Sequence, residues 1–300
     1  MRGNRNTYGV KLVSALALAG LFAGGVALAA ATTVSIGSAG PQPATVTIQW
    51  GDTVTFKNDD ARPHGITIPR VVQASPLIQP GTTWTRVFDG RAGNYGYRQT
   101  EGRSFLGSIV VELKGKVTLK ATPTNVVYGK RVTFSGEAPA GYAVTVEQLV
   151  LADAGQWEQV ALVNAGADGK WSTSLAPKLG ARFRATAAAG QLRAPAVSIR
   201  MQPTLSLVRP RGARAGKLVT VRGRIAPAGV ATAADLERYD AERRRWVRED
   251  RRKVGRSGAV SFRWKAVKGR QQLRVQVQRF ALKPGFQPGT SKPVFVTVSR

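Results

Sequence analysis

The stretch TVTIQWGDTVTFKNDDARPHGITI, Thr45–Ile68, decides the fold of the N-terminal part of this 300-residue chain. Within it, apolar side chains alternate with polar ones, as half-buried strands require, at Val46, Ile48, Val54 and Phe56. Gly51 and Asp52 separate the two alternating segments and predict a turn between two strands. The stretch ends in a polar loop that contains His64, the single histidine of the chain.

Two further blocks follow in order, SPLIQPGTTWTRVF (Ser75–Phe88) and NYGYRQTEGRSFLGSIVVE (Asn94–Glu112). Together the three blocks resemble the cupredoxin family, the plastocyanin and azurin type of blue-copper domain. The resemblance implies a cupredoxin-like Greek-key β-sandwich over residues 30–115. In that family an intact copper site implies electron transfer.

The metal site of the family is only partly present in this sequence. A blue-copper centre needs two imidazoles, one thiolate and a weak axial thioether. The resemblance places His64 at the first histidine, Gln99 at the thiolate, Gly102 at or near the second histidine and Phe105 near the methionine. Because the chain has no cysteine, we predict a degenerate site without a copper cofactor. The alternative is a plastocyanin-like copper-binding electron-transfer protein.

His64 itself has two interpretations. We favour a loop histidine that is either kept by descent or hydrogen-bonded at the end of the barrel. The alternative is a remnant metal ligand joined by Asp60 or Glu101. Asp59 and Asp60 could act as a carboxylate pair in acid–base chemistry, but an N-D-D sequence before a strand is typical of a turn. Neither G-x-S-x-G nor H-E-x-x-H occurs, and we predict no enzyme.

The first residues of the sequence have the pattern expected of an export signal. Three basic residues, Arg2, Arg5 and Lys11, precede an uncharged run rich in Ala, Gly and Leu, and Ala27-Leu28-Ala29 offers a cleavage site. This pattern predicts a signal peptide over residues 1–29, and the alternative is an uncleaved anchor. In both cases the remainder faces outside the cytoplasm, so we expect a secreted or cell-surface bacterial protein with no transmembrane segment after cleavage.

Residues 116–201 and 202–300 read as two diverged copies of one unit. The copies begin VTLKATPTNVVYGKRVTFSGEAPAG and PTLSLVRPRGARAGKLVTVRGRIAPAG, and they are rich in Val, Thr and turn-forming Gly and Pro. They resemble the bacterial Ig-like repeats of secreted and surface proteins, which implies spacer or adhesive modules. The predicted fold class is therefore all-β, a cupredoxin-like domain followed by two Ig-like β-sandwich domains. We expect few contacts at residues 114–116 and 202–203, and Trp157 and Trp246 to cover the cores.

Charge is concentrated in the last unit. Residues 202–300 hold 24 Lys and Arg against 6 Asp and Glu, within a net charge of +28 for the chain. The densest stretch is ERRRWVREDRRKVGR, Glu242–Arg256. It predicts a two-stranded ribbon that gathers seven basic residues at one end of the sandwich: Arg243, Arg244, Arg245, Arg248, Arg251, Arg252 and Lys253.

Such a focused positive field attracts polyanions with strong salt sensitivity. The expected partner is an anionic envelope polymer or another anionic surface. The alternative is a solvated face in which Glu249 and Asp250 pair with neighbouring arginines. No helix-turn-helix, zinc-finger or RNA-recognition signature accompanies the charge, so no sequence-specific nucleic-acid partner is predicted. The sequence therefore predicts an exported, non-enzymatic envelope or extracellular binding or structural protein.

Overall fold

The computed structural model describes residues 31–71, 74–99, 105–150 and 155–300. Within these ranges the regular structure is β, apart from one 3-10 turn, η1 (Arg279–Ala281). The all-β fold class is therefore confirmed. The predicted signal peptide, residues 1–29, lies outside the described residues. Among the residues that are described, no helix has the length and apolar character needed to cross a membrane.

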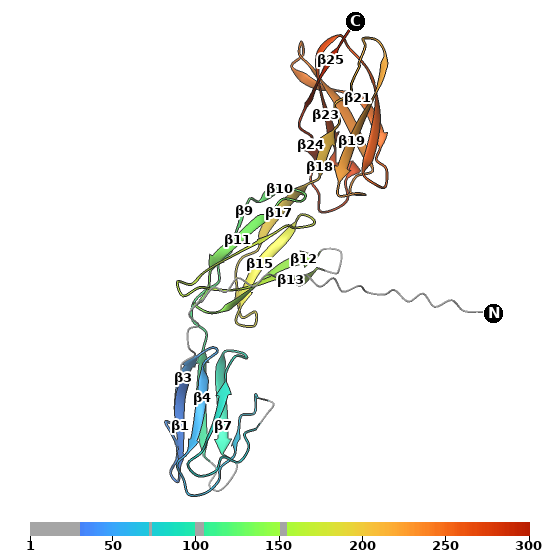
Figure 1. Ribbon diagram of the computed structural model, residues 1–300. Coiled ribbons are helices and arrows are strands. Elements are labelled where there is room, and N and C mark those ends of the chain that lie inside the picture. The colour runs from blue at the N-terminus through green and yellow to red at the C-terminus, as the bar shows by residue number, and fades with distance from the viewer. Residues whose placement is uncertain (1–30, 72–73, 100–104, 151–154) are drawn as a thin grey trace, which may run out of the picture.

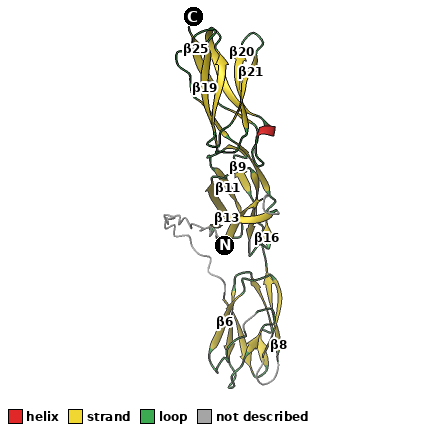
Figure 2. Ribbon diagram, turned by 90° about the vertical axis from the view of Figure 1, so that its right-hand side faces the viewer, coloured by secondary structure: helices red, strands yellow, loops and turns green. Residues whose placement is uncertain are grey.

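Six sheets form three units that follow one another along an elongated molecule, as Figures 1 and 2 show. Each unit has its own cluster of buried apolar side chains. We call residues 31–112 the head, residues 117–202 the middle unit and residues 204–298 the terminal unit. Whether the units fold independently, with boundaries near residues 115 and 202, stays a prediction.

The head is a sandwich of two four-stranded sheets. One sheet has the order β2-β1-β4-β6, with β1 Ala31–Gly37, β2 Gly40–Gln42, β4 Thr53–Asn58 and β6 Thr83–Val87. The other has the order β3-β8-β7-β5, with β3 Thr45–Gln49, β5 Ile66–Thr67, β7 Gly93–Gln99 and β8 Leu106–Glu112. The two predicted strands are present as β3 and β4, and the turn at Gly51 carries the chain from one sheet to the other. Strands β1 and β4, and β3 and β8, pair in parallel.

Aromatic packing fixes the two sheets of the head against each other. Phe56 of β4 meets Tyr97 of β7 edge to face, with 5.1 Å between the ring centroids. The Tyr97 hydroxyl is buried without a hydrogen-bond partner among the described residues, and burial raises the pKa of Tyr97 to about 12. Gly107 makes room for this ring, because a Cβ there would lie 2.2 Å from Tyr97 Cζ.

The middle unit pairs a small sheet with a larger one. The small sheet has the order β14-β11-β9, with β9 Lys120–Thr122, β11 Val132–Glu137 and β14 Lys170–Leu175. The larger has the order β10-β17-β15-β12-β13, with β10 Asn125–Val127, β12 Ala143–Val150, β13 Gln156–Asn164, β15 Ala181–Ala187 and β17 Val197–Gln202. Strand β16 (Leu192–Arg193) pairs with β15.

The terminal unit repeats this arrangement. Its small sheet has the order β18-β19-β22, with β18 Thr204–Leu207, β19 Leu218–Ala226 and β22 Ala259–Lys265. The larger sheet contains β20 Ala233–Asp240, β21 Arg245–Lys253, β23 Gly269–Val277, β24 Gly289–Thr290 and β25 Val294–Val298. The order β21-β20-β23-β25 matches β13-β12-β15-β17 of the middle unit. Both units therefore have the strand arrangement of an Ig-like sandwich.

The prediction that Trp157 and Trp246 cover the cores is wrong. Neither residue belongs to a buried apolar cluster. Each ring lies on the outer face of an edge strand, β13 or β21. An arginine covers it from the strand two places further into the same sheet, β15 or β23. The guanidinium of Arg184 lies 4.2 Å from the Trp157 ring centre, and that of Arg274 lies 4.0 Å from the Trp246 ring centre. Alternation along β13 and β21 turns these rings outward, and arginines cover them instead.

The expectation of few contacts at residues 114–116 and 202–203 is also wrong. At the first junction the rings of Trp50 in the head and Tyr142 in the middle unit pack 5.1 Å apart. At the second, Phe286, in a loop of the terminal unit, packs against the cores of the middle and terminal units. The N–H of Gly180 donates to the carbonyl of Gly285 at 2.8 Å, and the N–H of Gln287 donates to the carbonyl of Met201 at 2.7 Å. The loop that follows η1 therefore reaches back onto the middle unit, which a pattern of junction residues could not indicate.

Candidate functional site: the His64 end of the head and the β20–β21 ribbon

His64 lies at the end of the head that faces away from the middle unit. Strand β7 begins at Gly93, next to a loop that contacts the middle unit, and ends at Gln99. Six residues of strand separate these ends by about 20 Å. The side chain of Gln99 meets His64, so both residues lie at the free end of the molecule.

Asn58 builds the loop that presents His64. This side chain ends β4 and is fully buried. Its Nδ2 donates to the carbonyls of Arg62 at 2.7 Å and Ile78 at 2.8 Å, and its Oδ1 accepts from the N–H of Asp60 at 2.9 Å. The backbone of His64 then pairs with that of Ile78. One satisfied amide thus holds the polar loop in a single conformation.

The imidazole of His64 is 3% exposed and lies between two polar side chains. Its Nε2 is 2.9 Å from Asp60 Oδ2, and its Nδ1 is 2.7 Å from Gln99 Nε2. A neutral ring protonated at Nε2 satisfies both contacts, since it donates to Asp60 and accepts from Gln99. The hydrogen bond from His64, with a smaller contribution from the Ala61 N–H, lowers the pKa of Asp60 below its ordinary value.

This arrangement does not fit a blue-copper centre. An amide stands where the resemblance places the thiolate, and it is hydrogen-bonded to a ring nitrogen of His64. The chain has no cysteine, and the described ranges contain no group of three or more His, Cys, Asp or Glu that could hold a metal. The ring of Phe105 packs on Gly40. Glu101 and Gly102 lie outside the described residues.

The predicted ribbon exists, but its basic residues do not gather at one end. Strands β20 and β21 pair antiparallel from Ala233 with Lys253 to Asp240 with Arg245. Arg243 and Arg244 lie in the connecting turn, whereas Lys253 lies at the other end of β21, about 26 Å away. The run forms an entire edge strand of nine residues, so alternation spreads its charges along the sandwich.

Carboxylates neutralise part of this ribbon. Arg251 pairs with Asp235 at 2.6 Å, Arg252 with Asp250 at 2.8 Å and Arg243 with Asp240 at 4.0 Å. The remaining four predicted polyanion-binding residues are exposed and form no ion pair with any described residue: Arg244, Arg245, Arg248 and Lys253. Of the two acids named in the predicted alternative, Asp250 pairs with Arg252 of this run, whereas Glu249 pairs with Arg238 of β20. Polyanion binding by the unpaired residues stays a prediction.

A third concentration of arginines, between the head and the middle unit, was not predicted. Arg70, Arg86, Arg91 and Arg193 line one groove there. They stand singly in the sequence and come from two units, so neither a charge run nor a motif marks them. The chain topology alone brings them together.

Comparisons with known proteins give one partial match to a curated protein and distant matches to solved structures. No protein-family model matches the chain. Chloroplastic plastocyanin of Tetradesmus obliquus is 37% identical over 84 residues, which cover 24% of this chain and 57% of the plastocyanin. The chain thus spans little more than half the length of this curated relative, and the match supports a cupredoxin-like region.

The solved structures that match this chain include two distant ones. One is a tetra-tandem repeat from the extending region of a large adhesion protein, with a TM-score of 0.34 and 14% identity, covering 89% of this chain and 73% of that chain. The other is a marsupial T cell receptor, with a TM-score of 0.25 and 10% identity, covering 61% of this chain and 73% of the receptor. At such TM-scores neither likeness bears on the function of this chain.

Proposed function

We propose that this protein is an exported, non-enzymatic binding or structural protein of the cell envelope or extracellular space. A copper-less cupredoxin-like head is carried at the free end of two Ig-like units. The observation that carries the proposal is the 2.7 Å contact between Gln99 Nε2 and His64 Nδ1. Electron transfer by this fold requires a thiolate-bound copper, and a side-chain amide cannot supply that ligand.

Two further features support the binding or structural role. The signal-like N-terminal sequence supports export. The end-to-end units separate the His64 end of the head from the basic terminal unit (Figure 1). In this proposal the Ig-like units act as spacers, and the four unpaired basic residues of the ribbon contact an anionic envelope polymer.

Copper loading tests the proposal. The mature protein is incubated with Cu(II), excess metal is removed, and the visible spectrum and the metal content are recorded. We expect neither the intense blue band of a Cu–thiolate bond nor stoichiometric copper. A stoichiometric blue protein would instead establish the alternative, a plastocyanin-like electron-transfer protein.

A designed variant tests the correspondence of residues. The triple change Gln99→Cys, Gly102→His and Phe105→Met should create copper binding if these positions match the family ligands. Gln99→Ala is the matched control, because it removes the amide without adding a thiolate. Blue colour in the triple variant alone supports the assignment, whereas its absence in both contradicts the assignment of Gln99 to the thiolate position.

A further inference from the structure

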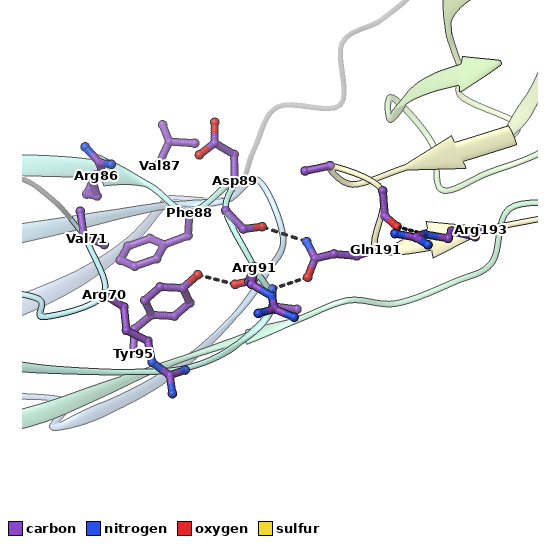
Figure 3. Close-up of a pocket in the computed structure, with 14 residues that line it drawn as sticks. Arg70, Val71, Arg86, Val87, Phe88, Asp89, Arg91, Tyr95, Gln191 and Arg193 are labelled. Carbon is purple, nitrogen blue, oxygen red and sulfur yellow. Dashed lines mark hydrogen bonds between the residues drawn. The ribbon is translucent and has the colours of Figure 1, made fainter. Parts of the chain in front are cut away.

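One glutamine ties the head to the middle unit. Gln191 lies in the turn between β15 and β16 and faces the head loop around Gly90 (Figure 3). Its Oε1 accepts from the N–H of Ala92 at 2.7 Å, and its Nε2 donates to the carbonyls of Gly90 at 2.9 Å and Ala188 at 3.0 Å. A single side-chain amide is thereby satisfied across the junction.

The turn that presents Gln191 has an unusual backbone. Ala188, Ala189 and Gly190 all have positive φ, at 50°, 51° and 80°. Alanine disfavours this left-handed conformation. Strained backbone of this kind persists where the surrounding contacts require it, and it concentrates at functional sites.

A second contact lies on the same junction. The rings of Trp50 and Tyr142 lie 5.1 Å apart, and the Tyr142 hydroxyl donates to the carbonyl of Trp50 at 3.2 Å. The Trp50 indole N–H also donates to the carbonyl of Gly90 at 2.7 Å, which Gln191 shares. Two contacts that meet at the Gly90 carbonyl therefore join the head to the middle unit.

The junction leaves a groove of about 1560 Å³ between the two units (Figure 3). Arg70, Arg86 and Arg91 of the head and Arg193 of the middle unit line it, with Asp89 as the one carboxylate of the lining. No ion pair joins any of the four arginines to a carboxylate in the described ranges. The groove therefore has an excess of positive charge that no carboxylate among the described residues neutralises through an ion pair.

Some of these arginines are already held in place by hydrogen bonds and keep N–H groups that an anion could accept from. Arg70 donates to the carbonyl of Asn94 at 3.1 Å, and Arg193 donates to the carbonyl of Gly190 at 2.7 Å. These single contacts orient the guanidinium groups and leave their other N–H groups available. The Nε of Arg86 is buried without an acceptor among the described residues. Partial desolvation of this cation favours an oxyanion at its remaining N–H groups.

The shape and lining of the groove restrict the class of ligand. Its volume exceeds the roughly 300–1,000 Å³ of sites for small molecules, which favours an oligomer over a single ion. A concave site between two units admits a linear chain, whereas a flat bilayer could not enter it. The rings of Phe88 and Tyr95 are 4% and 7% exposed and pack edge to face on each other. They offer no exposed platform for nucleic-acid bases.

We infer that the groove between the head and the middle unit binds a segment of a linear acidic polysaccharide. Guanidinium groups from both units contact its carboxylates as paired hydrogen-bond donors. Gln191 is a positioning residue, because it holds the two sides of the groove at a fixed separation. The site is incomplete in either unit alone, and it does not depend on whether the head binds copper.

Binding of short oligogalacturonate to the full mature protein tests this site at near-physiological salt. The groove variant is Arg91→Ser with Arg193→Ser, one change on each side of the junction. The matched control is Arg209→Ser with Arg211→Ser, two exposed arginines of the terminal unit that form no ion pair with a described residue, and it removes the same charge. We expect the groove variant to lose about tenfold or more in affinity, since each charge-assisted hydrogen bond is worth about a factor of ten. The control should change less than about twofold.

Gln191→Ala tests whether binding needs the geometry of the groove or only its net charge, because this variant keeps all four arginines. We expect it to weaken binding several-fold while the far-UV spectrum stays that of the wild type. Unchanged affinity in Gln191→Ala, or equal losses in the groove variant and the control, would overturn the site. The inference is also wrong if the wild type does not bind the oligomer, or if it binds a single-stranded oligonucleotide or anionic vesicles more tightly.

Discussion

The groove and the β20–β21 ribbon both gather arginines, yet their surroundings differ. The ribbon collects seven basic residues from one short stretch, Arg243–Lys253, and carboxylates pair with three of them. The groove collects four arginines that stand singly in the sequence and come from two units, and none pairs with a described carboxylate. The comparison shows that density of charge along a chain does not measure the charge that a folded surface offers to a ligand.

Strand pairing explains the difference. In the terminal unit, Asp235 lies directly opposite Arg251, and Glu237 lies opposite Arg274 on the other neighbouring strand. Cross-strand neighbours of opposite sign neutralise each other on the outer face of the sheet. In the groove the arginines come from loops, a strand edge and a second unit, so no paired strand supplies a facing acid. Their charge stays available.

Dissection of the chain should give the largest contrast between the two regions. The piece 30–201 contains both sides of the groove, whereas 30–115 lacks Arg193 and Gln191. We expect 30–201 to bind oligogalacturonate as the full protein does, and 30–115 and 202–300 to lose about tenfold or more. Calorimetric titration of each piece measures this.

The same pieces test the domain boundaries. The predicted domains 30–115, 116–201 and 202–300 should each unfold cooperatively when expressed singly. If 30–115 folds and binds as tightly as 30–201, the groove is not shared between units. If none of the three unfolds cooperatively, the boundaries near residues 115 and 202 are wrong.

Arg274→Ala tests whether arginines of the terminal unit are structural. Arg274 pairs with Glu237 at 2.6 Å and covers Trp246. Glu237 is 9% exposed, so removal of its partner should cost about 2–3 kcal/mol of unfolding free energy, below the value for a fully buried pair. Arg248→Ala is the matched control, because Arg248 lies opposite the same Glu237 without an ion pair. It should change stability by less than about 0.5 kcal/mol in urea unfolding.

The fold could be predicted well from local patterns. Alternation at Val46, Ile48, Val54 and Phe56 gave strands β3 and β4, and these side chains are buried in the head. Period-two patterning specifies which face of a strand is buried, and it needs no knowledge of the partner strand. The same reasoning failed for Trp157 and Trp246, because an aromatic residue at an outward position can be covered by an arginine instead of a core.

The residues around His64 could be predicted because the resemblance to a family assigns them positions in its metal site. It placed Gln99 beside His64, and the structure brings these residues together although they are 35 positions apart. Asp60 was considered as a partner of His64, and it contacts the ring. The groove could not be predicted, because its geometry depends on how two units dock through Gln191. Such docking leaves no periodic signal in the sequence.

The ribbon can still contribute a less specific affinity for long polyanions. Changing Arg244, Arg245, Arg248 and Lys253 to Ser should flatten the dependence of log affinity for long heparin on log salt, by up to about three units. Changing the ion-paired Arg243, Arg251 and Arg252 together with Arg256 removes the same charge and should flatten it less. Affinity chromatography at several salt concentrations measures both. Equal effects would show that only net charge matters.

The smallest expected effect concerns the contact between Asp60 and His64 at the free end of the head. The hydrogen bond from His64 lowers the pKa of Asp60. A carboxyl group with a lowered folded-state pKa contributes stability above its unfolded value, near about 3.9, and loses that contribution as pH falls through the folded pKa. Asp60→Asn should therefore be less stable than the wild type at neutral pH, and the difference should shrink as pH falls below about 4. Thermal unfolding of both proteins between neutral and acidic pH measures the difference.

Asp89→Asn is the control, since the Asp89 side chain makes no hydrogen bond or ion pair with its described neighbours. A difference between Asp60→Asn and the wild type that is constant across this pH range would show that the Asp60–His64 contact does not depend on the carboxylate charge.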